Sequence, residues 1–160
     1  MLDRLSALTA IRTALRERAS VLQANADVAR DEATHEDSRA ENKYDTRAIE
    51  AGYLAGAQAK RARDAAADAA WFEALPDAGP GGDAVRGPAL VALEDDDGVV
   101  HHYFVAARAG GLRVDVGDTA VRVVTLDAPL GRALVGAEVD DDVEVDVGAE
   151  RRSFVLLRID

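Results

Sequence analysis

The first part of the chain carries apolar side chains at helical spacing. In residues 2–33, leucine or alanine recurs every seven residues, with further alanines three and four positions apart. The spacing predicts a helix whose apolar face forms a coiled-coil seam, although an amphipathic helix in an ordinary bundle shows the same spacing. The members of this first stripe are Leu8, Leu15, Leu22 and Ala29, with Ala19, Ala26 and Ala33 between them and Leu5 and Ile11 ahead of them.

A second stripe follows in residues 39–75, and no proline interrupts it before Pro76. Its small side chains would let two helices pack closely while burying little area. Gly52 and Gly56 each weaken a helix by up to ~1 kcal/mol relative to alanine, and we interpret them as packing notches or points of close approach. Residues 1–75 therefore predict an antiparallel helical hairpin. The second stripe consists of Ala48, Ala51, Ala55, Ala62, Ala65, Ala69 and Phe72.

The stretch between the two stripes, residues 31–45, is acidic and reads DEATHEDSRAENKYD. We predict the turn of the hairpin near residues 34–38, because Ser38 and Glu41 fit a capping box that would start the second helix; Asp37 is an alternative cap. A helix of roughly 35 residues would hold this tip on the order of 50 Å from the base of the hairpin. Its carboxylates are Asp31, Glu32, Glu36, Asp37, Glu41 and Asp45.

The pattern changes after residues 76–88, whose prolines and glycines predict a linker. Beyond the linker, apolar and polar residues alternate with period two between turns rich in glycine and aspartate, which predicts a small antiparallel sheet over residues 89–160. Pro129 and Gly136 bracket one short helix. The expected strands are residues 89–94, 99–106, 112–116, 119–126, 142–147 and 153–159.

Charge is distributed unevenly along the chain. Residues 76–160 hold 8 of the 19 basic and 17 of the 30 acidic side chains, so −9 of the net charge of −11 lies there. Such an acidic half repels a phosphate backbone, which argues against direct nucleic-acid binding by that half. The sequence has no cysteine, no apolar run near the ~20 residues of a membrane span and no signal-peptide stretch. We therefore expect a soluble, cytoplasmic protein without disulfides.

Two groups of basic or imidazole side chains are weaker candidates for a site. His101 and His102 are adjacent in an expected strand, so they point to opposite faces and share no metal ion. Five basic residues of the hairpin would form either a stripe towards a partner or an ordinary solvated helix face: Arg12, Arg16, Arg39, Lys43 and Arg47.

A motif near the C-terminus resembles a known family. Residues 128–136, APLGRALVG, followed by residues 140–145, DDDVEV, are similar to the signature S-P-L-G-[KR]-A-L-[LI]-G…G-D-x-V-x-V of the Gre-factor family of bacterial transcription elongation proteins. The final Arg158-Ile-Asp also suits the last strand of that family. In the hairpin, aromatic and glycine positions fall at the family's spacings after the acidic tip: Tyr44, Gly52, Tyr53 and Gly56.

The resemblance implies an α+β protein with an antiparallel coiled-coil hairpin followed by an FKBP-like domain. It implies bacterial RNA polymerase as the partner: the hairpin enters the secondary channel towards the RNA 3′ end and stimulates the polymerase's own Mg²⁺-dependent cleavage of backtracked RNA. The protein would be no enzyme itself and would hold no cofactor of its own. By the resemblance, Asp37 and Glu41, with Glu36 as a substitute, share the Mg²⁺ with the polymerase.

The resemblance also suggests a contact to the polymerase in the second domain, where apolar side chains around the short helix would form a groove or, alternatively, cover the sheet. These residues are Pro129, Leu130, Leu134 and Val135. In the tip, the family pattern D-x-x-E-N-x-x-Y is shifted, because Glu41-Asn42 stands one residue closer to Tyr44. Two alternatives therefore stay open: a related factor that inhibits or redirects the polymerase without cleavage, and an adaptor in which a coiled coil oligomerises. The leading hypothesis predicts a monomer.

Overall fold

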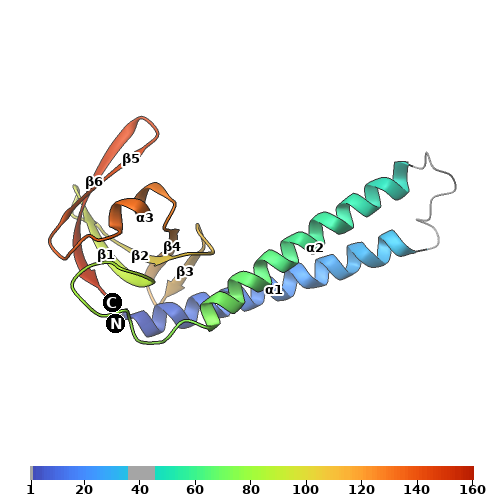
Figure 1. Cartoon of the computed structure of the whole chain (residues 1–160), viewed down its shortest axis with the longest axis horizontal. Helices are drawn as coiled ribbons and strands as arrows, with labels where there is room; N and C mark the ends of the chain where they lie inside the picture. Colours follow the sequence, from blue (N-terminus) through green and yellow to red (C-terminus); the bar gives the residue numbers. More distant parts are fainter. Residues whose placement is uncertain (1, 36–45) are drawn as a thin grey trace. The chain divides into compact units, whose positions relative to one another are not determined.

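The computed structural model describes residues 2–35 and 46–160. The chain divides into two compact units, Arg12–Glu73 on the one hand and Met1–Ile11 with Ala74–Asp160 on the other. The first unit is helical and the second contains the sheet (Figure 1). This composition confirms the predicted α+β class.

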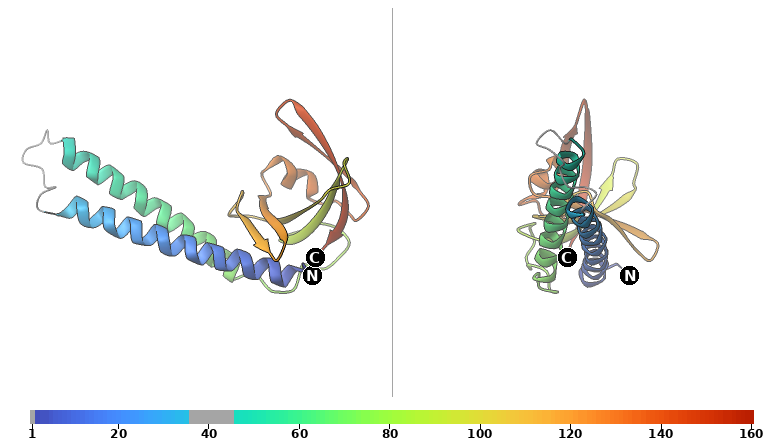
Figure 2. Two further views of the ribbon diagram at one scale, coloured as in Figure 1. Left: turned by 180° about the vertical axis from the view of Figure 1, so that it is seen from behind. Right: turned by 90° about the vertical axis from the view of Figure 1, so that its right-hand side faces the viewer.

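The helical unit is a hairpin within one chain. Helix α1 spans Arg4–Thr34 and helix α2 spans Thr46–Glu73, and the views in Figures 1 and 2 agree that the two run side by side. Their direction is antiparallel, because the start of α1 in this unit contacts the end of α2: the Nε of Arg12 donates to the backbone oxygen of Phe72 over 3.1 Å. Arg16 pairs with Glu73 at 2.6 Å. The predicted hairpin is therefore confirmed.

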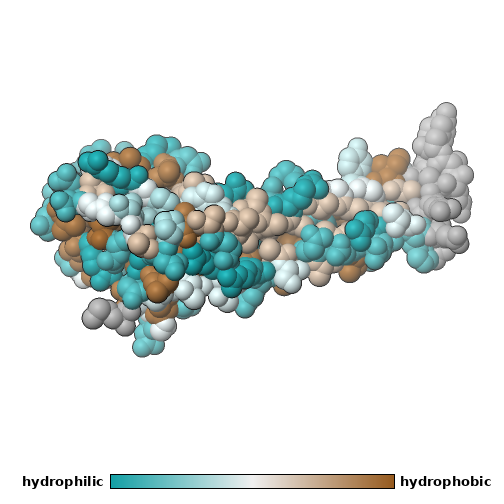
Figure 3. Space-filling model, turned by 60° about the horizontal axis from the view of Figure 1, so that its bottom comes forward, coloured by the Kyte–Doolittle hydropathy of each residue, from teal (hydrophilic) through white to brown (hydrophobic). Residues whose placement is uncertain are grey.

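Burial follows most of the predicted stripes, although Leu5, predicted to lie in the first stripe, is 50% exposed. Ala26 and Ala29 of α1 and Ala62 and Ala65 of α2 are buried, and within this unit only the neighbouring helix can cover them. Such small side chains bury little apolar area per residue, so the unit gains little hydrophobic stabilisation. The surface in Figure 3 accordingly mixes polar teal with pale, weakly apolar atoms along the helices. The predicted start of α2 and its capping box lie outside the described residues.

The interpretation of Gly52 and Gly56 as packing notches is wrong. Both glycines are exposed, and a Cβ atom added at either position would meet nothing within 4 Å. The glycines therefore leave the helix weaker without letting another element approach. A packing role was favoured over a helix break because helical composition continues on both sides of the glycines, but the stripe of alanines that faces α1 runs along a different side of α2.

We expect Gly52→Ala and Gly56→Ala to stabilise the hairpin by about 0.5–1 kcal/mol each, because alanine restricts the unfolded chain and favours the helix. Urea unfolding followed by circular dichroism measures the effect. As a control, Ala57→Gly, at another exposed position of α2, should destabilise by a similar amount. Loss of stability in the two alanine variants would show that another segment does approach these positions.

The sheet unit has six strands in the order β3-β4-β2-β1-β6-β5. Each strand begins and ends within three residues of its predicted bounds, because glycine and aspartate turns mark the chain reversals. The strands are β1 Ala89–Asp95, β2 Val100–Ala106, β3 Arg113–Val116, β4 Thr119–Thr125, β5 Asp142–Val147 and β6 Glu150–Ile159.

The sheet is mixed, whereas the sequence predicted an antiparallel one. Strand β4 pairs with β2 in parallel, with His102 beside Val121 and Ala106 beside Thr125, while the other four pairings are antiparallel. The physical reason lies in the order of the strands. The β3–β4 hairpin places β3 at the edge and β4 next to β2, so β4 runs in the direction of β2. The alternation of apolar and polar residues along a strand does not show which strand pairs with it or in which direction that strand runs.

Helix α3, Pro129–Leu134, covers one face of the sheet. Its fully buried Leu134 joins a core with Val91, Leu93 and Leu156. Gly131 is also buried, and a Cβ atom at this position would lie 1.9 Å from the backbone oxygen of Thr125. Only glycine allows the helix to approach the end of β4 so closely.

The first eleven residues belong to the sheet unit, so the compact units do not coincide with the predicted boundaries 1–75, 76–88 and 89–160. Arg4 is 5% exposed; its guanidinium donates to the backbone oxygens of Pro88 at 2.6 Å and Pro76 at 3.3 Å and lies 5.2 Å from the ring centroid of Phe104. Arg158 donates to the oxygen of Leu2. These contacts tie the N-terminus to the linker and the sheet. The division into domains stays a prediction.

Candidate functional site

The far end of the hairpin carries acidic side chains where they do not stabilise the helix. Asp31 and Glu32 lie exposed in the last turn of α1, and this turn contains no basic residue. The C-terminal end of a helix has partial negative charge, so carboxylates there are unfavourable by roughly 0.3–1 kcal/mol each. Arg30 offsets part of this, lying 3.5 Å from Asp27 and 3.7 Å from Asp31.

The three residues that the resemblance assigns to the shared Mg²⁺ are Glu36, Asp37 and Glu41, and all of them lie outside the described residues. Their roles and their register relative to Tyr44 stay predictions. Oxygen donors of this kind are the ligands that Mg²⁺ prefers. Within residues 2–35 and 46–160, no three carboxylate or imidazole groups come together as a metal site.

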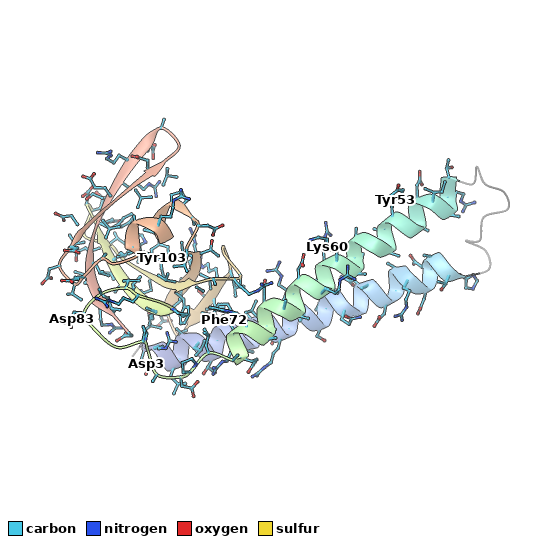
Figure 4. All side chains as sticks on the ribbon, viewed as in Figure 1. Asp3, Tyr53, Lys60, Phe72, Asp83 and Tyr103 are labelled. Atoms are coloured by element: carbon cyan, nitrogen blue, oxygen red, sulfur yellow. The ribbon has the colours of Figure 1, made fainter. Side chains whose placement is uncertain are left out.

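Near the same end, α2 exposes apolar side chains. Tyr53 is 78% exposed and extends from the outer side of the helix (Figure 4). Ile49 precedes it by one helical turn and is 49% exposed; Leu54 is 52% exposed. These three exposed side chains lie within six residues of one another in the first part of α2.

The described members of the predicted basic stripe, Arg12, Arg16 and Arg47, do not share one surface. Arg12 and Arg16 contact Phe72 and Glu73 at the base of the hairpin, and the hydrogen bond from Arg16 lowers the pKa of Glu73. Arg47 belongs to the opposite end, in the first turn of α2. Arg39 and Lys43 lie outside the described residues. Arg12 and Arg16 therefore close the base of the hairpin, where they satisfy the carbonyl and carboxylate groups at the end of α2.

The four apolar residues predicted to contact the polymerase divide into two kinds. Leu134 is fully buried and Leu130 is half-buried, and both pack in or against the core of the sheet unit. Pro129 is exposed, and Val135 is 55% exposed. Leu134 therefore supports the sheet and is unavailable to a partner, whereas Pro129 and Val135 lie on the surface.

His101 and His102 occupy opposite faces of β2 and have different surroundings. The Nε2 of His101 lies 2.7 Å from the Oδ2 of Asp95, and its ring packs edge-on against Phe154. The hydrogen bond from His101 is the main reason why the pKa of Asp95 is lowered. Burial, followed by the charges of Arg158 and His101, lowers the pKa of His102 below its usual 6.5.

The lowered pKa of His102 predicts a pH-dependent stability. The unfolded chain binds the His102 proton more readily than the folded one, so the stability that this residue contributes is complete above pH 6.5 and decreases as the pH falls below that value. We expect His102→Gln to flatten the loss of stability between about pH 7 and pH 5. Thermal unfolding across this range measures it, with the exposed His35→Gln as control. Parallel profiles for wild type and His102→Gln would contradict the assignment.

Some residues of interest were missed by the sequence reasoning. Arg4 occupies a polar position in an apolar stripe, and only its distant hydrogen-bond partners show its role. Asp3 and Ser6 form a reciprocal cap at the start of α1, with the amide of Ser6 2.7 Å from the Oδ1 of Asp3. That cap has a local signal, since the two residues stand three apart ahead of an apolar stripe.

The structure thus defines an α+β protein that combines a helical hairpin with a six-stranded mixed sheet. Among the described residues, no helix is both long and apolar enough to cross a membrane. No family model matches the chain. A sequence comparison finds the transcription elongation factor GreA of Sphingopyxis alaskensis, 30% identical over 79 residues, which is 49% of this chain and 46% of that protein. The chain therefore matches about half the length of this curated relative.

Two solved structures are weakly similar. GreA factor homolog 1 (Gfh1) of Thermus thermophilus aligns with a TM-score of 0.40 and 18% identity over 94% of this chain and 95% of that one. The elongation factor GreA/GreB of Nitrosomonas europaea aligns with a TM-score of 0.38 and 14% identity over 69% and 91%. The sequence comparison thus finds similarity, over 49% of this chain, to a member of the family that the C-terminal motif resembles.

Proposed function

We propose that this protein is a transcription elongation factor of bacterial RNA polymerase. In this proposal the hairpin enters the secondary channel of the polymerase, and carboxylates at its tip complete a Mg²⁺ site that cleaves backtracked RNA. The polymerase supplies the catalysis, and the protein acts as its activator. The proposal is supported by the sequence match to GreA and by the motif of residues 128–145.

One observation of the structure carries most of the argument. The described part of α1 ends in two carboxylates, Asp31 and Glu32, that are placed against the helix dipole; the last turn contains no basic residue, and Arg30 just before it lies 3.7 Å from Asp31. Residues that only needed to stabilise a hairpin would favour Lys or Arg at this end of α1. An acidic end that lowers stability is explained if its carboxylates serve a partner, and Mg²⁺ chemistry on RNA needs such oxygen ligands.

The hairpin also has the form that delivery requires. It is built from one chain, and its two helices pack through alanines, which keeps it narrow. Helix α2 extends over 28 residues, a length of roughly 40 Å at 1.5 Å per residue. Exposed Ile49, Tyr53 and Leu54 near the acidic end give the polymerase an apolar surface to cover.

The direct test uses halted elongation complexes that have backtracked. Purified protein with Mg²⁺ should shorten the RNA from its 3′ end and allow synthesis to resume. Slowed synthesis without shortening would instead support the alternative of an inhibitory relative, which the one-residue shift of Glu41-Asn42 towards Tyr44 favours. Light scattering distinguishes both from an adaptor, because an intrachain hairpin leaves a monomer, whereas the adaptor requires an intermolecular coil.

A further inference from the structure

A polar cavity on the sheet unit is lined by three arginines from different strands. Its volume is about 560 Å³, and its walls include Arg113 of β3, Arg122 of β4 and Arg152 of β6, with Tyr103 of β2 between them. Asp118 is the one carboxylate among its lining residues. Residues 76–160 carry a net charge of −9, whereas the charged lining of this cavity is mainly positive.

Strand pairing places two of these arginines against each other. Arg113 and Arg122 stand directly opposite in the antiparallel β3–β4 pair, and Tyr103 stands beside Arg122 in the parallel β2–β4 pair. Residues paired in this way share a face of the sheet, and like charges directly opposite each other are destabilising. The pair does not serve the stability of the sheet, whereas an anion bound between the two guanidinium groups would relieve their repulsion.

The hydrogen-bond donors of these arginines are not taken up by the protein's own carboxylates. The nearest carboxylate oxygen to Arg113 belongs to Asp115 and that to Arg152 belongs to Glu150, each at 3.7 Å, which is beyond hydrogen-bond distance. Among the residues that the structure describes, Arg122 has no ion-pair partner. A guanidinium group carries five N–H donors in a planar fork that matches the oxygens of a phosphate.

A second cavity adjoins the first and is apolar. It measures about 440 Å³, shares Tyr103, Arg122 and Arg152 with the polar cavity, and is otherwise lined largely by apolar side chains such as Leu130 and Phe154. Volumes of ~300–1,000 Å³ are typical of small-molecule sites. The shared residues would let one ligand place an anionic group over the arginines and an apolar or aromatic part beside Tyr103.

We propose that this cavity binds a small phosphorylated molecule of nucleotide type, with its phosphates on Arg113, Arg122 and Arg152 and its base in the adjoining apolar cavity. A long nucleic acid does not fit this chemistry, because residues 76–160 carry a net charge of −9, which repels an extended phosphate backbone. The site concerns the sheet unit alone and is independent of the proposed action on RNA polymerase.

The test is calorimetric titration of the purified full-length protein, without polymerase or Mg²⁺, with pyrophosphate, ATP and adenosine. We expect saturable binding of pyrophosphate and tighter binding of ATP, with adenosine weaker than either. Arg122→Gln should weaken pyrophosphate binding by about tenfold or more, since hydrogen bonds between charged groups are lost. The control Arg86→Gln removes an exposed arginine that lines neither cavity and should leave the affinity within about twofold.

Amide shifts of the wild-type protein give a readout that does not depend on how the variants fold. Pyrophosphate should shift the signals of Tyr103, Arg113 and Arg122 first. The proposal is overturned if no saturable binding occurs at millimolar pyrophosphate, or if Arg86→Gln weakens binding as much as Arg122→Gln. It is also overturned if the shifts lie outside the cavity, or if a single-stranded RNA binds while pyrophosphate and ATP do not.

Discussion

Replacing Asp37 by Asn and Glu41 by Gln together is expected to reduce Mg²⁺-dependent cleavage of backtracked RNA by about 100-fold, the order of effect seen when transition-state electrostatic stabilisation is lost. Both substitutions keep the size of the side chain and remove its charge. An amide oxygen binds Mg²⁺ far less strongly than a carboxylate, so under the proposed function the tip would no longer hold the Mg²⁺ that it is proposed to share with the polymerase.

The size of the effect should depend on the register of the tip. If Asp37 and Glu41 are the metal pair, each single variant should lose most of the activity, whereas Glu36→Gln should lose little. If Glu36 replaces Asp37 as a metal ligand, Glu36→Gln should lose most of the cleavage activity and Asp37→Asn should lose little. The series thus also determines which carboxylates the shifted tip uses.

The control is Asp83→Asn, which removes an exposed carboxylate of the sheet unit (Figure 4) and should leave cleavage unchanged. Affinity of the double variant for RNA polymerase should also be unchanged, because the tip acids act on the metal and not on attachment. Equal cleavage by the double variant and the wild type would contradict a catalytic role for the tip and would favour ordinary solvation of a helix turn.

Substitution of Gly131 by alanine is expected to destabilise the sheet unit by about 3 kcal/mol, at the upper end of the usual penalty for overpacking. The added Cβ atom would lie 1.9 Å from the backbone oxygen of Thr125. Since a backbone group cannot rotate away as a side chain can, α3 or the end of β4 has to move. That movement would also disturb Leu134 in the core.

Hydrogen exchange of the amides in β4 measures this destabilisation within the sheet unit, and thermal unfolding measures it for the whole chain. Gly87→Ala is a matched control, because a Cβ atom there meets nothing within 4 Å and the residue does not have positive φ; it should change stability by less than about 0.5 kcal/mol. If Gly131→Ala proves as stable as Gly87→Ala, the close approach of α3 to β4 is not real.

The sequence predicted most of the local structure, for reasons that particular residues show. Buried Leu15, Ala26 and Ala29 lie on the stripe that the seven-residue spacing defined. The glycines at turns, such as Gly98 with φ of 76° and Gly117 with φ of 59°, adopt the left-handed conformation that ends the predicted strands. These signals are local, so a single sequence contains them.

Features that depend on distant neighbours were not predictable. The parallel pairing of β2 with β4 depends on which strand takes the edge position, and alternation does not record this. The burial of Arg4 depends on Pro76 and Pro88, more than 70 residues away. Gly52 and Gly56 were interpreted as packing notches because helical composition continues on both sides of them, and such composition does not show which element, if any, approaches a glycine.

The sequence shows the residue types of the candidate site, while the roles of Glu36, Asp37 and Glu41 stay predictions. The acidic composition of residues 31–45 and the motif of residues 128–145 were visible at once. Leu134, however, is in the core, while its neighbour Val135 is on the surface. In a helix as short as α3, composition alone does not show which side of the helix faces the sheet. The arginine cavity depends on three strands that only the fold brings together.

Site-specific cross-linking tests the central claim most directly, namely that the acidic end of the hairpin reaches the catalytic centre of RNA polymerase. The chain has no cysteine, so a photoreactive group on Thr46→Cys, at the start of α2 and exposed, labels one position. The account predicts that this group cross-links to the RNA 3′ end or to the polymerase segments around the catalytic Mg²⁺ in backtracked complexes, whereas the same group at Asp83→Cys does not. Cross-links from Thr46→Cys only to the outer surface of the polymerase, or none at all, would contradict it.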